Sequence, residues 1–504
     1  MSSPSESEQL RELQSEIEAF IEYLPHPILV ENEVELLDLT SCHWRLSIEF
    51  GKLIFTAGGS GRSISRRVED VAYRDLERLG IFVRKPGGRE TTTLEFRQMR
   101  AAPRVVRGAG RTAFREQFVS MLERQYRGWR FERVSNRSDR EHSFSAWYTR
   151  GLASQGRSAW AFLGLGEAEG IAAADGVLAF GLIWLDSLRI HFDRLVIPQL
   201  KLFLPPAAIS LAANRAACLA PMAVEVEIFE WRPGQSSPTP VDLKDYGNIA
   251  TRLVERHQVE SLIANHQSLL HDLLGPLFAE VDIVPDSAGT SLSLRIAGLE
   301  VARVEGQLSP RVYFGLEGSS RRLDESRRNE FMNFLLQVRA IRRAGSADPQ
   351  HDFYRLQSER WLESVLLKDI TRLDPALSPT HVYQQVPAFK GTDRGVIDLL
   401  AVTGSGRLAV VELKVHEEIN LPVQGLDYWL RVKWLQDRNQ LQEFGYFPGH
   451  ALSRDAPLLY LVSPAFRFHS TTEKILRYFG NEIVFTLVGI NDSWRKELKV
   501  LFRH

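Results

Sequence analysis

The sequence predicts an α/β protein built from several domains. Its 504 residues exceed what a single hydrophobic core usually organises. Strand-like and helix-like hydrophobic patterns alternate along most of the chain, and a short glycine-containing gap joins two apolar strands within Gly395–Lys414. We therefore expect a β-rich N-terminal module, a mixed α/β middle region and a C-terminal core with the order αβββαβ.

The predicted domain boundaries follow changes in this pattern. Residues 1–110 hold an amphipathic helix and a β-rich module. Residues 111–232 form an α/β domain whose helix, strand and hairpin order is similar to the order near the C-terminus, so a degenerate, non-catalytic duplicate is one interpretation of it. Residues 233–344 begin with the loop sequence PGQSSPTP and contain helices and a small β meander. Residues 345–504 form the last domain.

The composition is that of an ordinary soluble protein, with 44% hydrophobic and 25% charged residues and a net charge of −1. Only Cys42 and Cys218 are present, which excludes a disulfide framework and fits a reducing cytosol. The acidic N-terminal segment is unlike a signal peptide, and no apolar run reaches the roughly 18 residues that a membrane span needs. We expect a cytoplasmic protein with no membrane partner.

Arginine is concentrated in one stretch. Between Arg100 and Arg140 there are eleven arginines, no lysine and four acidic residues. The guanidinium group matches phosphate oxygens, so this stretch is a candidate for contacts with a nucleic-acid backbone. The simpler interpretation is a solvated surface of ion pairs.

The two strands around the glycine-containing gap are Val396–Val402 and Leu408–Lys414. A loop that closes symmetrically about Ser405 would place Asp398 opposite Glu412, with Cβ atoms about 4.5–5.5 Å apart. Because side chains alternate along a strand, Glu412 and Lys414 share one face and Leu413 points to the other. This pairing would bring two carboxylates and one ammonium group together.

Two carboxylates in an apolar sheet repel each other unless one takes up a proton or a divalent cation lies between them. Oxygen ligands of this kind suit Mg²⁺ or Mn²⁺, and a nearby lysine can orient a water molecule or stabilise phosphate charge. The alternative is a salt-bridged hairpin in which Lys414 neutralises one acid, and it leaves the second carboxylate uncompensated.

Two predicted helices flank the hairpin. Asp352–Leu373 carries Glu359 and Glu363, which are four residues apart and therefore lie on one helical face. A second helix starts at Pro422, a favoured first position for proline. One stripe of this second helix is expected to face the hairpin and carries Gln424, Tyr428 and Arg431.

The order of an acidic helix, Asp398, Glu412-Leu413-Lys414 and Gln424 resembles the PD-(D/E)xK nuclease superfamily, which includes many restriction enzymes, Holliday-junction resolvases and RecB-like nucleases. The resemblance covers roughly residues 350–504. The residue before the aspartate is Ile397 rather than proline, at a position that varies in the superfamily. The resemblance implies a restriction-endonuclease-like fold for the C-terminal core.

The resemblance also implies residue roles. One or two Mg²⁺ or Mn²⁺ ions would be held by Glu359 or Glu363 together with Asp398 and Glu412, and the carbonyl of Leu413 would add a ligand. Lys414 would position the attacking water. The substrate phosphate would be oriented by Gln424, Tyr428 and Arg431. Gln424 is thus expected in both the catalytic and the substrate-binding set.

The function expected from these observations is metal-dependent hydrolysis of phosphodiester bonds, in the first instance by a Mg²⁺-dependent endo- or exodeoxyribonuclease. The expected partner is nucleic acid, above all DNA, and a homodimer is one assembly to consider. Two alternatives stay open. One is a catalytically weak or inactive nucleic-acid-binding or assembly protein, and the other is a defence nuclease acting on RNA or DNA after a ligand binds the first 340 residues.

Overall fold

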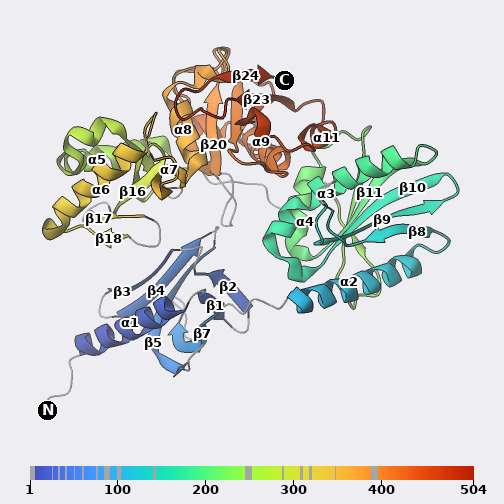
Figure 1. Ribbon diagram of the computed structural model, residues 1–504, viewed down its shortest axis with the longest axis horizontal. Coiled ribbons are helices and arrows are strands. Elements are labelled where there is room, and N and C mark those ends of the chain that lie inside the picture. The colour runs from blue at the N-terminus through green and yellow to red at the C-terminus, as the bar shows by residue number, and fades with distance from the viewer. Residues whose placement is uncertain are drawn as a thin grey trace. The chain divides into compact units, whose positions relative to one another are not determined.

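The computed structural model of the protein describes residues 6–24, 27–31, 34–39, 43–49, 52–59, 62–74, 78–84, 91–98, 104–139, 144–243, 253–286, 289–306, 310–316, 320–346, 348–387 and 396–504. These residues form a mixed α/β structure that contains four β-sheets (Figure 1). The chain divides into two compact units. The first is Met1–Pro103 with Gly315–Arg321 and Phe389–Gly395, and the second is Arg104–Phe314 with Arg322–Ala388 and Val396–His504.

The first unit is an antiparallel sheet with one helix. The described strands follow the order β2-β1-β7-β6-β5-β4-β3. Ile17, Phe20 and Ile21 of the helix recur at helical spacing and are buried with strand residues such as Leu53 and Phe55. The elements are α1 (Glu6–Tyr23), β1 (Pro27–Glu31), β2 (Val34–Asp38), β3 (His43–Glu49), β4 (Lys52–Gly59), β5 (Arg62–Arg74), β6 (Arg78–Arg84) and β7 (Thr91–Gln98).

The second unit begins with a domain that we call the first α/β domain. Its sheet has the strand order β13-β12-β11-β10-β9-β8. Helix α2 covers one face, where Phe118 packs with Trp160 and Phe162, while α3 and α4 cover the other face (Figure 1). The elements are α2 (Arg104–Gln125), β8 (Arg130–Ser135), β9 (Tyr148–Gln155), β10 (Ser158–Leu165), α3 (Gly170–His191), β11 (Val196–Leu204), α4 (Pro206–Ala216), β12 (Glu225–Glu230) and β13 (Thr239–Pro240).

A β-meander domain follows, in which β14, β15, β16 and β17 pair antiparallel in chain order. Gly298, in the turn between β15 and β16, has φ +79, and a Cβ atom there would lie 2.2 Å from the carbonyl oxygen of Arg360. The turn is therefore packed tightly against the next domain. The elements are α5 (Arg256–Leu274), β14 (Val281–Pro285), β15 (Ser291–Ile296), β16 (Leu299–Glu305), β17 (Arg311–Phe314), β18 (Arg321–Arg322) and α6 (Arg328–Ile341).

The C-terminal domain has the strand order β19-β20-β21-β22-β23-β24, and its elements occur in the predicted sequence of helix, three strands, helix and strand. The expected helix Asp352–Leu373 is interrupted, because Gln357 has φ +45 and separates α7 from α8. The elements are α7 (Asp352–Arg355), α8 (Ser358–Lys368), β19 (Tyr383–Pro387), β20 (Val396–Val402), β21 (Leu408–Leu413), α9 (Leu421–Asp437), α10 (Gln440–Glu443), β22 (Leu458–Pro464), α11 (Thr472–Leu476), β23 (Val484–Ile490) and β24 (Val500–Arg503).

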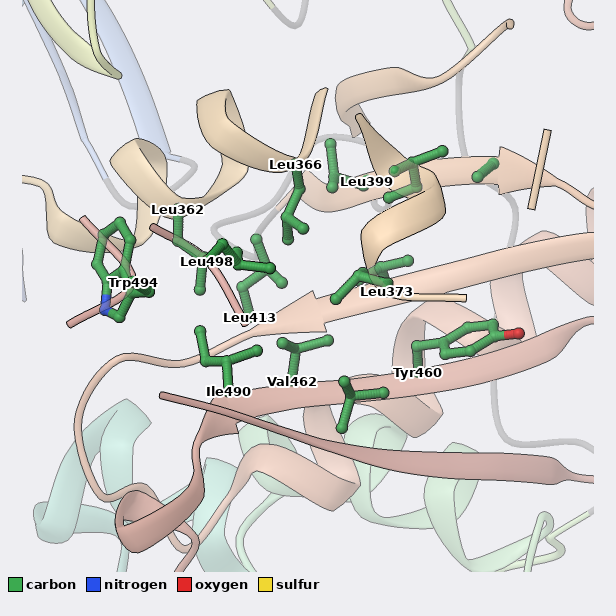
Figure 2. Close-up of a cluster of buried hydrophobic side chains, with 14 of the residues drawn as sticks. Leu362, Leu366, Leu373, Leu399, Leu413, Tyr460, Val462, Ile490, Trp494 and Leu498 are labelled. Carbon is green, nitrogen blue, oxygen red and sulfur yellow. The ribbon is translucent and has the colours of Figure 1, made fainter. Parts of the chain in front are cut away.

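Helix α8 is held against the C-terminal sheet by a hydrophobic core. Figure 2 shows Leu362 and Leu366 of α8 directed toward Leu413 and Val462 of the sheet. All four side chains are fully buried. This packing fixes both the depth and the rotation of α8, and therefore the places of Glu359 and Glu363 relative to β20 and β21.

The first α/β domain and the C-terminal domain share one topology. In each sheet the first two strand pairs are antiparallel, the next two are parallel and the last is antiparallel. In each domain a helix directly before the sheet (α2 or α8) is followed by a helix between the third and fourth strands (α3 or α9, the latter with the short α10) and by one between the fourth and fifth (α4 or α11). Their strand orders correspond from β8 through β13 and from β19 through β24.

The two domains contact each other through equivalent elements, α3 with α11 and α4 with α9. Leu219 and Phe479 each follow the last of these helices in their domain, and the two residues form an antiparallel β-bridge. The backbone N–H of Ala220 donates to the carbonyl of Tyr478 (2.8 Å), and that of Gly480 donates to Cys218 (2.9 Å). Equivalent residues that pair antiparallel indicate an approximate twofold relation between the two domains.

Candidate functional site

The β20–β21 hairpin has the predicted register. Leu399 pairs with Val411 and Val402 with Leu408, which is symmetric about Ser405. The loop closes with a hydrogen bond from the N–H of Thr403 to the carbonyl of Arg407 (2.8 Å). Gly406 has φ +85, in the region that favours glycine. Asp398 and Glu412 therefore stand at the same level of the two strands, one step beyond the last paired residues.

Asp398, Glu412 and Lys414 lie together at the open end of this hairpin. Oδ2 of Asp398 accepts a hydrogen bond from the backbone N–H of Leu413 (2.8 Å). Nζ of Lys414 donates to Oε1 of Glu412 (2.7 Å) and to the carbonyl of Leu413 (3.3 Å). Oε2 of Glu359 on α8 is 3.9 Å from the same Nζ. Three acidic groups thus surround one ammonium group.

The carboxyl groups of Asp398 and Glu412 favour their protonated forms, chiefly because both are buried. Burial and the charge of Asp398 raise the pKa of Glu412 well above its usual range. Burial also raises the pKa of Asp398, although the charge of Lys414 opposes this change. For Lys414, burial lowers the pKa, but the charges of Glu412 and Asp398 outweigh it and raise the pKa. The ammonium group of Lys414 is therefore charged, and its single positive charge compensates only part of the negative charge that the neighbouring carboxylates would carry.

Glu359 and Glu363 occupy different surroundings on α8. The Glu359 side chain is 41% exposed, whereas Glu363 is 1% exposed. Nε2 of Gln385 donates to Oε2 of Glu363 (2.7 Å). Burial and the charge of Asp398 raise the pKa of Glu363 to about 8. The structure thus brings both helix acids to the group, Glu359 beside Lys414 and Glu363 beside Asp398.

Gln385 is a member of the group that no sequence pattern indicated. The β19–β20 ladder pairs Gln384 with Leu399 and Val386 with Ile397, so Gln385 lies across from Asp398. Its φ of +54 is unusual for a residue that is not glycine. Left-handed residues inside a strand are rare, and such strain is common at functional sites.

Tyr428 of α9 lies close to the group, whereas the printed contact of Gln424 on the same helix is with the first α/β domain. Nε2 of Gln424 donates to Oδ2 of Asp175 on α3 (3.4 Å), while its Oε1 is buried without a partner among the described residues. Burial and the charges of Glu412 and Asp398 raise the pKa of Tyr428 well above its usual range, as expected for a phenol close to both carboxylates.

Arg431, the third residue of the expected stripe, contacts the backbone of its own helix and lies close to the first α/β domain. Arg431 is 4% exposed and its Nη1 donates to the carbonyl of Asp427 (3.1 Å). Its charge acts instead on the buried thiol of Cys218 in the first α/β domain. A residue seven positions after Gln424 lies about 20° from the same direction of the helix, and here the contact with the neighbouring domain decides its environment.

A buried ion-pair network joins α9 to the first α/β domain. Nη2 of Arg215 on α4 is 2.6 Å from Oδ2 of Asp427 and 2.7 Å from Oδ1 of Asp175. The Arg215 side chain is 1% exposed. Burial alone would lower the pKa of Arg215, but the charges of Asp427 and Asp175 raise it. Asp175 is therefore fixed between Arg215 and Gln424, and no sequence motif had singled it out.

The matching hairpin of the first α/β domain carries no carboxylate on the corresponding face. Residues of β9 and β10 that face α3 are Tyr148, Arg150, Leu152, Ala161, Leu163 and Leu165. The hydroxyl of Tyr148 donates to the carbonyl of Ala173 on α3 (2.7 Å), which identifies this face. The acids of β20 and β21 therefore have no acidic counterparts there.

Two cavities are lined by residues that are next in the chain to members of the group. Each has a volume of about 480 Å³, and both are lined by His416 and Arg495. The first also contains Val415, directly after Lys414, and the second contains Ser358, directly before Glu359. The two cavities are therefore lined by chain neighbours of Lys414 and Glu359 and not by the acidic side chains themselves.

The donor set fits a hard divalent cation. Oε2 of Glu412 and Oε1 of Glu363 are buried, and neither has a hydrogen-bond partner among the described residues. Carboxylate oxygens are the ligands that Mg²⁺ and Mn²⁺ prefer. In the described part of the chain, no three His, Cys, Asp or Glu side chains are already arranged around a common metal position.

Comparison of the sequence with protein-family models and with curated proteins finds no match. Within the described ranges, no helix is long and apolar enough to cross a membrane.

Proposed function

We propose that this protein is a metal-dependent nuclease that hydrolyses phosphodiester bonds in nucleic acid, DNA in the first instance. The proposal rests on one observation: the hairpin register and α8 bring Asp398 and Glu412 together with Glu359, beside Lys414, and Glu363, beside Asp398, and two of the buried carboxylate oxygens lack partners among the described residues. Such a group is costly unless a cation and an anionic substrate compensate it.

The proposed role of each residue follows from its position in the site. Asp398 and Glu412, with Glu359 or Glu363, would hold one or two Mg²⁺ or Mn²⁺ ions. A bound ion of this kind supplies charge stabilisation and lowers the pKa of a coordinated water. Lys414, charged and 2.7 Å from Glu412, is placed to donate a hydrogen bond to the attacking water or to a phosphate oxygen.

Gln424 and Tyr428 complete the proposed site on the side of α9. The Oε1 of Gln424, which has no partner among the described residues, would accept a hydrogen bond from water, and the phenol of Tyr428 stays protonated and can donate to a phosphate oxygen. The carbonyl oxygen of Leu413 would be a further ligand, and Nζ of Lys414 donates to this oxygen at 3.3 Å.

The experiment is cleavage of plasmid DNA and of labelled single-stranded and double-stranded oligonucleotides in Mg²⁺ or Mn²⁺. We expect Asp398→Asn, Glu412→Gln and Lys414→Met each to reduce the rate by about 100-fold or more, because each removes one charge from the reacting group. The matched control is Asp437→Asn, which removes a 52% exposed carboxylate at the end of α9. It should cleave like the wild type.

Two results would contradict the proposal. One is equal cleavage by the wild type and the three site variants, which would trace the activity to a contaminant or to another site. The other is no cleavage of DNA or RNA by the wild type in either metal. Retained nucleic-acid binding in that second case would favour the binding or assembly protein.

A further inference from the structure

We propose that the two cavities that share His416 and Arg495 form one groove that binds an unpaired nucleic-acid strand and leads it to the carboxylate group. This inference rests on the proposed function, since it names the substrate class of that site. We call this surface the strand groove, and the residues that carry the argument are Arg355, His416, Phe466, Arg467 and Arg495.

The charge of the strand groove favours an anion. Arg355 and Arg467 are exposed and make no ion pair within the described residues, whereas the acids on the walls are Asp352 and Asp492. Arg495 adds a third guanidinium at the place where the cavities meet. An excess of unpaired guanidinium groups in a concave surface is suited to phosphate oxygens.

Arg495 is held in place before any ligand arrives. Its Nη2 donates to Oγ of Ser358 (2.6 Å), and the guanidinium lies over the rings of Trp494 (4.3 Å), Trp361 and Tyr354. Its Nε is buried and has no partner in the described structure. Stacking on three aromatic rings fixes the plane of the guanidinium, so the remaining N–H groups keep a constant direction.

The first turn of α8 adds to the same preference. Ser358 begins α8 and also lines the strand groove. The backbone N–H groups at a helix N-terminus carry partial positive charge and favour an anion. Glu359 stands next to Ser358, so a phosphate bound at this helix end would lie one residue away from the carboxylate group.

Phe466 indicates an unpaired strand rather than a double helix. Its ring is 86% exposed although it lines a cavity. An exposed aromatic ring beside basic residues is the arrangement on which single-stranded bases stack. A cavity of about 480 Å³ is in the range of small-molecule sites, so it accommodates a nucleotide or two of one strand but not a duplex.

The test is fluorescence anisotropy of the full-length chain with a 5′-labelled single-stranded oligonucleotide, measured over a salt series in EDTA and again in Ca²⁺. We expect Arg355→Ala and Arg467→Ala to weaken binding several-fold and to reduce the salt slope by roughly 0.7 each, because each removes one phosphate contact. Phe466→Ala should weaken binding roughly fivefold or more with an unchanged slope, because stacking releases no counterions.

The matched control is Arg454→Ala. Arg454 is exposed and follows Ser453, whose N–H donates to Gly406, so it lies at the opposite end of the hairpin from Lys414. Its loss should leave binding unchanged. None of the three groove side chains to be replaced is buried, and thermal unfolding should therefore match the wild type.

Each remaining outcome decides the inference. Wild-type binding by the Arg355, Arg467 and Phe466 variants overturns it, and so does a blunt duplex or a mononucleotide that competes as well as the oligonucleotide. If the wild type cleaves nothing but the variants lose binding as expected, the strand groove stands and the catalytic proposal falls. If the groove variants still cleave and bind as the wild type does, the catalytic proposal stands and the strand groove falls.

Discussion

Asp175 of the first α/β domain accepts a hydrogen bond from Gln424 of the C-terminal domain, across 249 positions of sequence. Arg215 holds Asp175 on its other side at 2.7 Å. The amide nitrogen of Gln424 is engaged by Asp175, while its oxygen is buried and has no hydrogen-bond partner among the described residues. A domain without the acidic hairpin thus orients a side chain of the domain that has it.

We therefore predict coupling between Asp175 and Gln424. Asp175→Ala and Gln424→Ala should each reduce cleavage by about 10–100-fold, the usual effect of losing an orienting partner. The double variant should lose no more cleavage activity than the less active of the two single variants, because both changes remove the same orientation. The measurement is kcat and KM for the four proteins, with Mn²⁺ affinity by calorimetry as a second readout.

The control for that cycle is Tyr478→Phe. It removes the 3.4 Å contact of Arg189 with the Tyr478 hydroxyl, which also links the two domains but lies away from Gln424. It should leave kcat unchanged. Multiplicative losses in the Asp175 and Gln424 double variant would show that Asp175 supports the fold rather than Gln424.

The hairpin loop gives a prediction about stability. Gly406 has φ +85, and a Cβ atom there would lie 2.0 Å from the carbonyl oxygen of Ala451. Gly404, two residues earlier, would meet nothing within 4 Å. Gly406→Ala should lower the free energy of unfolding by about 2–4 kcal/mol, through backbone strain and the clash, whereas Gly404→Ala should change it by less than about 1 kcal/mol. Urea denaturation measures both.

A Gly406→Ala protein as stable as the Gly404→Ala protein would mean that the loop does not fix the register. The cleavage rate offers a second check on the same pair. Because the register sets Asp398 level with Glu412, loss of the loop geometry should reduce cleavage even in the fraction that stays folded.

The hairpin shows what the sequence allowed us to predict. Register is a local property, set by a five-residue loop with Gly406 and by alternation along two apolar strands, so the grouping of Asp398, Glu412 and Lys414 followed from residues 396–414 alone. The helix after it was also locally encoded, with Pro422 in the first turn of α9.

The rest of the site depends on how separate domains dock. The Gln424 partner lies in α3, and Arg431 lies close to Cys218 of the first α/β domain because α9 packs against α4. The strand groove gathers residues from three separate segments of the chain, and no periodicity relates Arg355, Phe466 and Arg495 to one another. Likewise, the shared topology of the two α/β domains is a property of strand order, which alternation of side chains does not encode.

Lys414 is predicted to support both stability and activity. Its ammonium group compensates Glu412, which is 2% exposed, at 2.7 Å. Lys414→Met should lower the free energy of unfolding at pH 8 in EDTA by about 3–5 kcal/mol, since a buried carboxylate loses its partner. The loss should be smaller at pH 5, where Glu412 takes up a proton more readily.

Addition of Mn²⁺ should return part of that stability, because the cation replaces the lost charge. The control is Lys433→Met on α9, whose partner Asp437 is 52% exposed, and which should change the unfolding free energy by less than about 1 kcal/mol. A Lys414→Met protein with wild-type stability at both pH values would contradict the view that this ammonium group compensates buried charge.

Glu363 should make the metal-free protein less stable as the pH rises. Burial and the charge of Asp398 raise its pKa from 4.5 to about 8, while Arg295, Arg360 and the amide of Gln385 oppose that change. The folded chain therefore keeps a proton that the unfolded chain releases above about pH 4.5. The stabilisation from that proton is present at low pH and is lost between about pH 4.5 and 8.

In EDTA we expect the unfolding temperature of the wild type to fall between pH 5 and pH 8, and Glu363→Gln to flatten this fall, because the amide stays neutral and can still accept from Gln385. Asp398 and Glu412 contribute in the same direction, so part of the slope should remain. Glu443→Gln, at an exposed position of α10, should keep the wild-type slope.

Saturating Mn²⁺ should stabilise the wild type most at pH 8, since the cation competes with the protons that the carboxylates otherwise hold. Parallel pH profiles for Glu363→Gln and the wild type would place the titrating carboxyl group elsewhere in the chain.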